Sequence, residues 1–161
     1  MTKIVSNTGP IISLEKLRDG FNFIHKLYEK IILPPAVLQE LSQGDFTSPL
    51  EYLRHFKIED LIEIKPVQNI CSIYEIERLD EGEKQAISLA IELNLPLLIE
   101  ETIGRRLAIS AGVHISGIAG QTMKAYKEKI IADFEAKAKL QELLDAGRIN
   151  RRIYDKLMDS F

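Results

Sequence analysis

The sequence predicts one α/β domain, a three-layer α/β/α arrangement with a mostly parallel central sheet. Short apolar runs recur along the chain, and segments with apolar residues at helical spacing separate them. Strands that alternate with helices form βαβ units, whose helices cover both faces of a parallel sheet. With 161 residues, the chain is long enough for one domain with a substantial core.

The predicted strands are short and mainly apolar. They cover residues 4–5, 31–33, 61–64, 96–99 and 113–115. The run Leu97-Leu98-Ile99 has no polar residue, as expected for a parallel strand that is covered on both faces. Pro34-Pro35 ends the second run, because proline lacks the N–H that a sheet needs.

The segments between these runs carry helix signals. Pro10 suits the first turn of a helix, and the carboxylates of Asp80 and Glu83 suit the positive end of another. Helix terminators follow three segments, at Gly44, Asn94 and Gly112. The predicted helices cover residues 10–17, 21–29, 36–42, 80–94, 104–111, 120–129, 134–144 and 150–161, whereas residues 45–60 look helical but are poorly patterned.

The sequence contains no internal repeat, low-complexity segment or linker. We therefore expect one domain over residues 1–130, with residues 131–161 as its helical C-terminal extension. The last helix has a wide apolar face, formed by Ile149, Ile153, Leu157 and Phe161. This face either packs on the domain's own outer helices or docks on a second copy or another protein. We expect a homodimer to which the C-terminal helices contribute.

The composition is that of a soluble globular protein, with 45% hydrophobic and 28% charged residues. No apolar run approaches the roughly 20 residues that span a bilayer. The first strand follows the N-terminus directly, so no secretory signal is expected. Cys71 is the only cysteine and forms no intramolecular disulfide. These features predict a cytoplasmic protein without membrane association.

The net charge of −3 neither supports nor excludes a nucleic-acid substrate. Residues 1–123 carry −5 and residues 124–161 carry +2, and a carboxylate cluster for a metal would account for much of the N-terminal excess. The Gly-rich phosphate loops and the nucleophile elbow of common enzyme classes are absent from the sequence. The three histidines have no second His or Cys at zinc-ligand spacing.

Four acidic residues stand at or just after the ends of apolar runs: Glu40, Glu83, Glu100 and Glu101. Hard divalent cations prefer several carboxylate oxygens at one point, and ligand crevices form at the carboxyl ends of parallel strands. Each residue also has a simpler interpretation. Glu40 suits a solvated surface, Glu83 a helix N-terminus, and the Glu100–Glu101 pair salt bridges to Arg105 and Arg106.

Gly104, Arg105 and Arg106 form a second candidate feature. A glycine before two arginines at a helix N-terminus can hold a phosphate through backbone N–H groups and guanidinium forks. Alternatively, one arginine clamps the neighbouring carboxylates and sets their orientation. The sequence leaves both interpretations open.

These motifs, taken in order, resemble a PIN domain. They are Ser6-Asn7-Thr8 after the first strand, Pro35 to Leu41, Gly82 to Ile87, and Leu98 to Glu101. The resemblance covers nearly the whole chain and is densest between Leu79 and Lys127. The resemblance is strongest to a branch of the family with two motifs, Gly-Glu-x-x-Ala-Ile, here Gly82 to Ile87, and Gly-Arg, here Gly104-Arg105. The C-terminal ending of that branch is similar to residues 144–152.

The resemblance implies a Mg²⁺- or Mn²⁺-dependent ribonuclease, including the VapC-like toxins that a small antitoxin protein holds. It also implies an RNA substrate and frequent dimers. Its acidic site maps onto Asn7, Glu40, Glu83 and Glu100 or Glu101, with Thr8 placed to hydrogen-bond a ligand water and Arg105 or Arg106 to hold the phosphate.

Two positions depart from the family pattern, because the family has Asp where this chain has Asn7 and commonly Asp where it has Glu100. An amide oxygen can coordinate Mg²⁺ but brings no charge, so metal binding should weaken. The leading hypothesis is a metal-dependent ribonuclease, and the rival is a catalytically inactive PIN-like protein that binds RNA or a protein partner. A phosphotransfer receiver is disfavoured, because Ile64-Lys65-Pro66 supplies no aspartate after the third strand.

Overall fold

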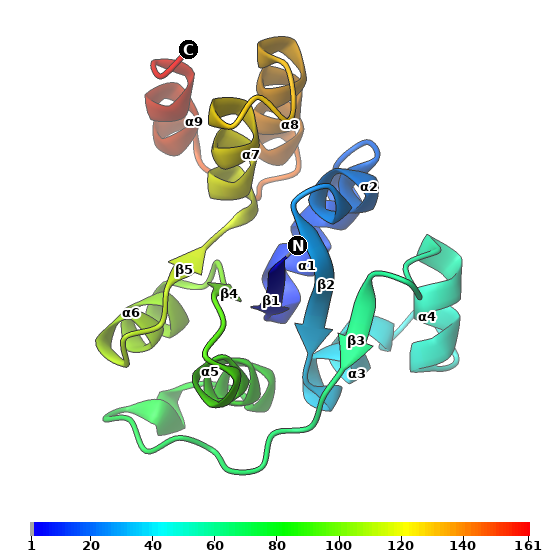
Figure 1. The fold of residues 1–161 in the computed structure, drawn as a ribbon, viewed down its shortest axis with the longest axis vertical. Helices are drawn as coiled ribbons and strands as arrows, with labels where there is room; N and C mark the ends of the chain where they lie inside the picture. The colour runs from blue at the N-terminus through cyan, green and yellow to red at the C-terminus, as the bar shows by residue number, and fades with distance from the viewer. Residues whose placement is uncertain (1) are drawn as a thin grey trace.

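The computed structural model describes residues 2–161, and over this range the central sheet has five strands, all parallel (Figure 1). Their order across the sheet is β3-β2-β1-β4-β5. The strands are β1 (Thr2–Ser6), β2 (Tyr28–Leu33), β3 (Ile62–Ile64), β4 (Leu97–Leu98) and β5 (Ile115–Ser116). The predicted α/β class with a parallel sheet is thus confirmed.

The strand order places a topological switch point between β1 and β4. The chain builds outward from β1 through β2 to β3 and then returns to the other side of β1 with β4 and β5. Crevices for ligands form outside the carboxyl ends of strands at such a point. Residues that follow β1 and β4 therefore face the same crevice.

Strands β4 and β5 are shorter than predicted, with two residues each. Hydrogen bonds nevertheless extend over the predicted segments. Val5 N–H donates to the carbonyl of Pro96 (3.0 Å), Leu97 N–H to that of His114 (2.9 Å), and Ile99 N–H to that of Ser116 (3.0 Å).

Helices cover both faces of the sheet and form two separate apolar cores. Ile4 and Val5 are neighbours on β1 and point to opposite faces, one into each core. The larger core joins the sheet to α1 (Thr8–Lys16), α2 (Gly20–His25), α3 (Pro35–Ser42), α4 (Pro49–Phe56), α7 (Ile118–Lys127) and α8 (Asp133–Asp145). The smaller core involves α5 (Glu81–Leu93) and α6 (Thr102–Ser110).

The helix predicted at residues 21–29 was too long at its C-terminal end. α2 ends at His25, and β2 already begins at Tyr28. Tyr28 pairs with Thr2 of β1, its ring is buried, and its hydroxyl donates to Gln121 (2.8 Å). Tertiary pairing thus overrides the local helical pattern. The poorly patterned stretch holds α4, which starts at Ser48 as N-cap.

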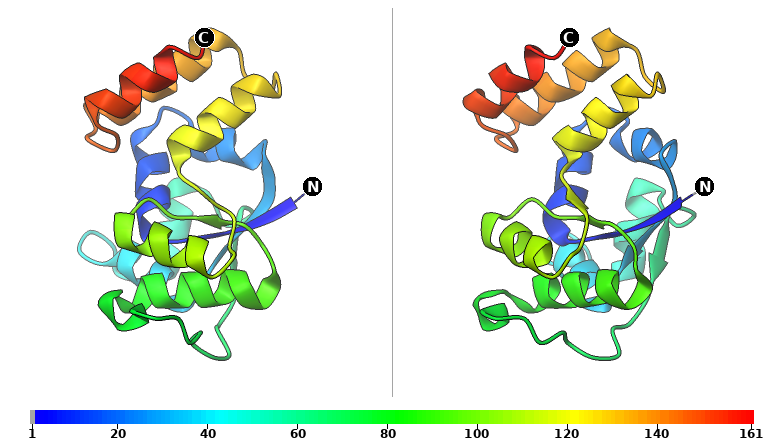
Figure 2. Two further views of the ribbon diagram at one scale, coloured as in Figure 1. Left: turned by 90° about the vertical axis from the view of Figure 1, so that its left-hand side faces the viewer. Right: turned by 60° about the vertical axis from the view of Figure 1, so that its left-hand side comes forward.

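The C-terminal helices α7, α8 and α9 (Arg151–Met158) lie side by side at one end of the molecule (Figure 2). Phe161 stacks on Tyr126 with 4.5 Å between the ring centroids, and the Tyr154 hydroxyl donates to Gln141 (3.0 Å). Within residues 151–158 no side chain is fully buried. Across residues 2–161, no helix has the length and apolarity to cross a membrane.

Candidate functional site

Six of the predicted site residues come from four parts of the fold and line one pocket at the switch point. Asn7 and Thr8 follow β1, Glu100 and Glu101 follow β4, Glu40 lies on α3, and Glu83 lies on α5. Residues that were not predicted as part of the site complete the lining: Gly9, Asp80, Gly147 and Arg148.

Glu83 is the most buried carboxylate of the pocket, with 9% of the residue exposed. It closes a capping box at the start of α5: its Oε1 accepts from the Asp80 N–H (3.3 Å), and its own N–H donates to Asp80 Oδ1 (2.8 Å). Its Oε2 is buried, and among the described residues no N–H or O–H group donates to it, although the Glu101 carboxylate can accept the proton of a protonated Glu83. Burial first, and then the neighbouring Glu101 carboxylate, raises the pKa of Glu83 to about 8.

Glu101 is the N-cap of α6. Its two carboxylate oxygens accept from the backbone N–H groups of Ile103 (3.0 Å) and Gly104 (2.6 Å). Burial raises the pKa of Glu101, but these N–H groups and the contact with Glu83 outweigh it, so the pKa is lowered overall. The two carboxyls therefore differ in charge near neutral pH: Glu101 is ionised, and Glu83 retains its proton.

Asn7 is 5% exposed and precedes α1 at the N-cap position, yet its side chain makes no capping hydrogen bond. Its backbone is fixed, because its N–H donates to the Leu98 carbonyl (2.9 Å) and its carbonyl accepts from the Ser6 hydroxyl (2.8 Å). Its side-chain Oδ1 is buried and unpartnered within residues 2–161. A buried polar atom without a partner is costly, so this oxygen is a candidate ligand atom.

Glu40 reaches the pocket from the second turn of α3. Its Oε2 accepts from the Thr8 hydroxyl (2.8 Å), so Thr8 orients a carboxylate directly. The other oxygen lies against the first turn of α5, where a Cβ added to Gly82 would be 2.5 Å from Glu40 Oε1. Gly104 has the same role for Glu83, because a Cβ there would be 3.1 Å from Glu83 Oε2. The two glycines make room for the carboxylates.

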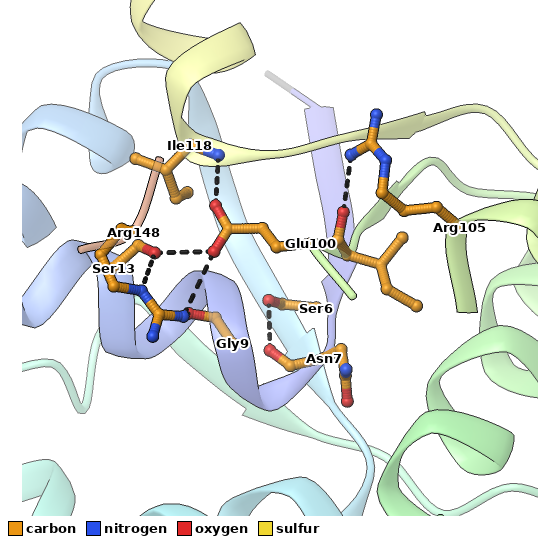
Figure 3. Close-up of polar contacts among 9 residues, drawn as sticks. Ser6, Asn7, Gly9, Ser13, Glu100, Arg105, Ile118 and Arg148 are labelled. Atoms are coloured by element: carbon orange, nitrogen blue, oxygen red, sulfur yellow. Dashed lines mark hydrogen bonds and ion pairs between the residues drawn. The ribbon is translucent and has the colours of Figure 1, made fainter. Parts of the chain in front are cut away.

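Glu100 differs from the other carboxylates because protein groups occupy both of its oxygens (Figure 3). Oε1 accepts from the Ser13 hydroxyl (2.6 Å) and pairs with Arg148 Nη2 (3.5 Å), and Oε2 accepts from the Ile118 N–H at the start of α7 (2.9 Å). The Asn7 amide points away from this group in Figure 3. The pocket thus has two parts. In one, protein groups bind Glu100, and the other contains the unpartnered oxygens of Asn7 and Glu83.

The two predicted arginines lie outside the acidic pocket. Arg105 donates from Nη1 to the Ile99 carbonyl (2.9 Å), and Arg106 pairs with Glu75 (3.0 Å) on the exposed surface. Neither pairs with Glu100 or Glu101. The basic residue of the pocket is Arg148, from the α8–α9 connection, which sequence reasoning missed. The sequence signal for Arg148 was only the tail motif, which carries no information about its distant contacts.

The chemistry of the site suits a hard cation. The pocket offers oxygen donors from carboxylates and an amide, which Mg²⁺ and Mn²⁺ prefer, and two of these oxygens are buried without partners. In the part of the chain that the structure describes, no group of three or more His, Cys, Asp or Glu residues lies close enough to hold a metal ion as it stands. Side-chain rotation would have to complete such a site, so the metal roles of these residues stay a prediction.

The sequence matches a known protein family, and the structure has similarity to a solved one. A sequence model of the PIN domain matches residues 3–161. Among solved structures, a PilT N-terminus domain protein from the hyperthermophilic archaeon Sulfolobus solfataricus is similar, with 18% sequence identity and a TM-score of 0.46. The alignment covers 73% of this chain and 87% of that one. No curated protein sequence gives a significant match.

Proposed function

The chain belongs to the PIN domain family, and from this premise we propose that it is a divalent-metal-dependent ribonuclease. The family has a nuclease-type fold and generally depends on divalent metals. RNA as substrate and Mg²⁺ or Mn²⁺ as the ion are the specific parts of the proposal.

The observation that carries the proposal is the pair of buried, unpartnered oxygens, Asn7 Oδ1 and Glu83 Oε2, in one acidic pocket. A cation bound at this point would offset the cost of burying such atoms. Asn7, Glu40, Glu83 and Glu101 would hold the ion. The chemistry that such an ion supplies is neutralisation of charge at a phosphate and activation of a water nucleophile.

The protein groups prepare this site. The Thr8 hydroxyl holds Glu40 toward the pocket, and the backbone N–H groups of α6 keep Glu101 ionised. Glu83 carries a proton near neutral pH because of its raised pKa. It must release this proton when a cation binds, so metal affinity should rise with pH.

A second candidate function is RNA binding without cleavage. Asn7 brings no charge, and Glu100 is committed to Ser13, Arg148 and Ile118. Both features reduce the negative charge available to a metal. Four further expectations remain predictions from the sequence: that the protein acts as a toxin, that a small antitoxin protein binds it, that it forms a homodimer, and that it is cytoplasmic.

The test is cleavage of a mixed RNA pool with Mn²⁺ or Mg²⁺, with metal binding measured separately by calorimetry. Glu83→Gln should abolish cleavage, whereas Glu81→Gln, at an exposed position of the same helix turn, should not. Asn7→Asp should tighten Mn²⁺ binding by adding a charge. Equal cleavage by wild type and Glu83→Gln would place the activity elsewhere, and RNA binding without any cleavage would favour the second candidate.

A further inference from the structure

Arg148 lines two neighbouring hollows. One is the acidic pocket, and the other lies between α6, the start of α7 and α9. We call the second one the α6–α9 hollow. Apolar, polar and glycine residues line it, including Thr102, Arg105, Gly117, Gly120, Ile149 and Ile153. Glu100 and Arg148 belong to both linings, so the two hollows meet at this ion pair.

The Arg148 guanidinium is fixed on one side and open on the other. Nε donates to the Ser13 hydroxyl (2.9 Å), and Nη2 donates to the Gly9 carbonyl (3.0 Å) and pairs with Glu100 (Figure 3). Within residues 2–161, no hydrogen bond involves Nη1, and 27% of the side chain is exposed. A guanidinium that is already oriented loses little entropy when it binds a phosphate.

The charge of the acidic pocket opposes the approach of a phosphate. The pocket is lined by five carboxyl side chains, from Glu40, Asp80, Glu83, Glu100 and Glu101. The carboxylates among them repel a phosphate, whereas Arg148 adds a positive charge to the lining of the same pocket. Of the two arginines predicted for this task, Arg106 is paired with Glu75, and Arg105 lines the α6–α9 hollow but not the acidic pocket.

We propose that Arg148 binds a backbone phosphate of a single-stranded RNA that runs along the α6–α9 hollow to the acidic pocket. The inference rests on the proposed function and names the residue that positions its substrate. Ile149, Ile153 and Leu157 offer an apolar wall to the bases. Arg105 supplies a second positive charge along this path.

The test measures binding of a fluorescent single-stranded RNA by anisotropy, in EDTA and at several salt concentrations. Each lost phosphate contact lowers the slope of log K against log salt by about 0.7 for a single strand. Arg148→Gln should show this fall, and Arg148→Lys should keep most of the slope because it keeps the charge. Arg106→Gln is the matched control, since it removes the same charge from the exposed pair with Glu75.

Two further variants test whether Arg148 binds a phosphate or only stabilises the fold. Ser13→Ala removes an anchor of Arg148 and keeps its charge, so the salt slope should not change. Ile153→Asp places a negative charge in the α6–α9 hollow and should weaken RNA binding, whereas Ile109→Asp, at a more exposed position on α6, should not.

Three results would overturn the inference: no measurable RNA binding by the wild type, an unchanged slope in Arg148→Gln, or an equal loss of slope in Ser13→Ala and Arg148→Gln. Failure of the proposed function looks different. If the wild type binds RNA with the expected Arg148 dependence but never cleaves it with Mn²⁺, the nuclease proposal fails and the phosphate site stands. If the wild type cleaves RNA but Arg148→Gln leaves the salt slope unchanged, the nuclease proposal stands and the phosphate site at Arg148 is wrong.

Discussion

At the residue scale, Glu83 and Glu101 are two carboxyls with opposite surroundings. Backbone N–H groups stabilise the Glu101 charge, whereas Glu83 has a buried oxygen without a donor. Like charges in contact cannot both ionise easily, so the proton stays on the group with the poorer environment. A site that is ready for a cation therefore stores one proton when no cation is bound.

The raised pKa of Glu83 predicts a pH-dependent stability. The folded pKa is about 8 and the ordinary value is 4.5, so between these limits the folded protein binds more protons than the unfolded chain. Stability from this group is full below the lower limit and falls as pH rises through the window. The lowered pKa of Glu101 acts only at lower pH, where stability is lost as pH falls.

Glu83→Gln cannot titrate at this position. The thermal midpoint of Glu83→Gln minus that of the wild type should therefore grow as pH rises from about 5 to about 8. Thermal unfolding in EDTA across this range measures the difference. Glu81→Gln is the control and should follow the wild-type curve. Parallel curves for wild type and Glu83→Gln would show that Glu83 titrates normally.

Gly82 provides a second prediction at this scale. Alanine in place of glycine normally stabilises a helix by up to about 1 kcal/mol. Here the new Cβ would collide with Glu40 Oε1 and disturb the hydrogen bond from Thr8. Gly82→Ala should thus destabilise the wild type but stabilise the Glu40→Ala protein. A double-mutant cycle from thermal unfolding measures the coupling, and purely additive effects would contradict the contact.

Only part of the site was predictable residue by residue. Glu40 lies on a helix that the helical spacing of apolar residues predicts, and Glu83 lies in the first turn of a helix that its N-terminal carboxylates predict. These two pocket residues could therefore be named from the sequence. The engagement of Glu100 could not, because its partners Ser13 and Arg148 are far away in sequence. Glu75 likewise lies far from Arg106 in the chain and could not be recognised as its partner.

At the scale of elements, local signals predicted the helices best where caps and periodicity agree. α5 has both a capping box and an apolar stripe, and its predicted ends are nearly right. α4 has an N-cap but only one fully buried residue, Tyr52, so its pattern is weak. The extent of β2 depends on pairing with β1, which no local pattern contains.

Tyr52 joins α4 to α1 through its hydroxyl, which donates to Glu15 Oε2 (2.8 Å). Burial and this carboxylate raise the pKa of Tyr52, so the hydroxyl stays a donor. Tyr52→Phe should cost about 1–3 kcal/mol, because a half-buried carboxylate loses its donor. Chemical denaturation measures the change. Tyr74→Phe, at a residue that is 87% exposed, should have no effect, and equal stability of both variants would rule out the bond.

At the scale of the whole molecule, the surface expected for self-association changes: Ile149 and Phe161 of the predicted face pack on the protein's own larger core, so residues at the start of α8 become the candidate. Phe134, in the first turn of α8, is 70% exposed, and Ile130 nearby is 38% exposed. Exposed apolar groups of this kind mark association sites when they cluster. Neither residue lines the α6–α9 hollow.

We expect full-length protein to have twice the monomer mass in light scattering, and Phe134→Ser to have the monomer mass. Tyr74→Ser, an exposed aromatic outside the C-terminal helices, is the control and should remain dimeric. If wild type and Phe134→Ser have equal mass, this surface does not mediate association.

The ion pair between Glu100 and Arg148 also has a consequence for the order in which a newly made chain acquires its parts. All five strands and every pocket carboxylate precede residue 148 in the sequence. Domains generally form from the N-terminus as translation proceeds. A chain that is halted or cleaved before Arg148 would hold the carboxylates without the arginine that we propose as the phosphate ligand. Translation must therefore pass residue 148 before the pocket is complete.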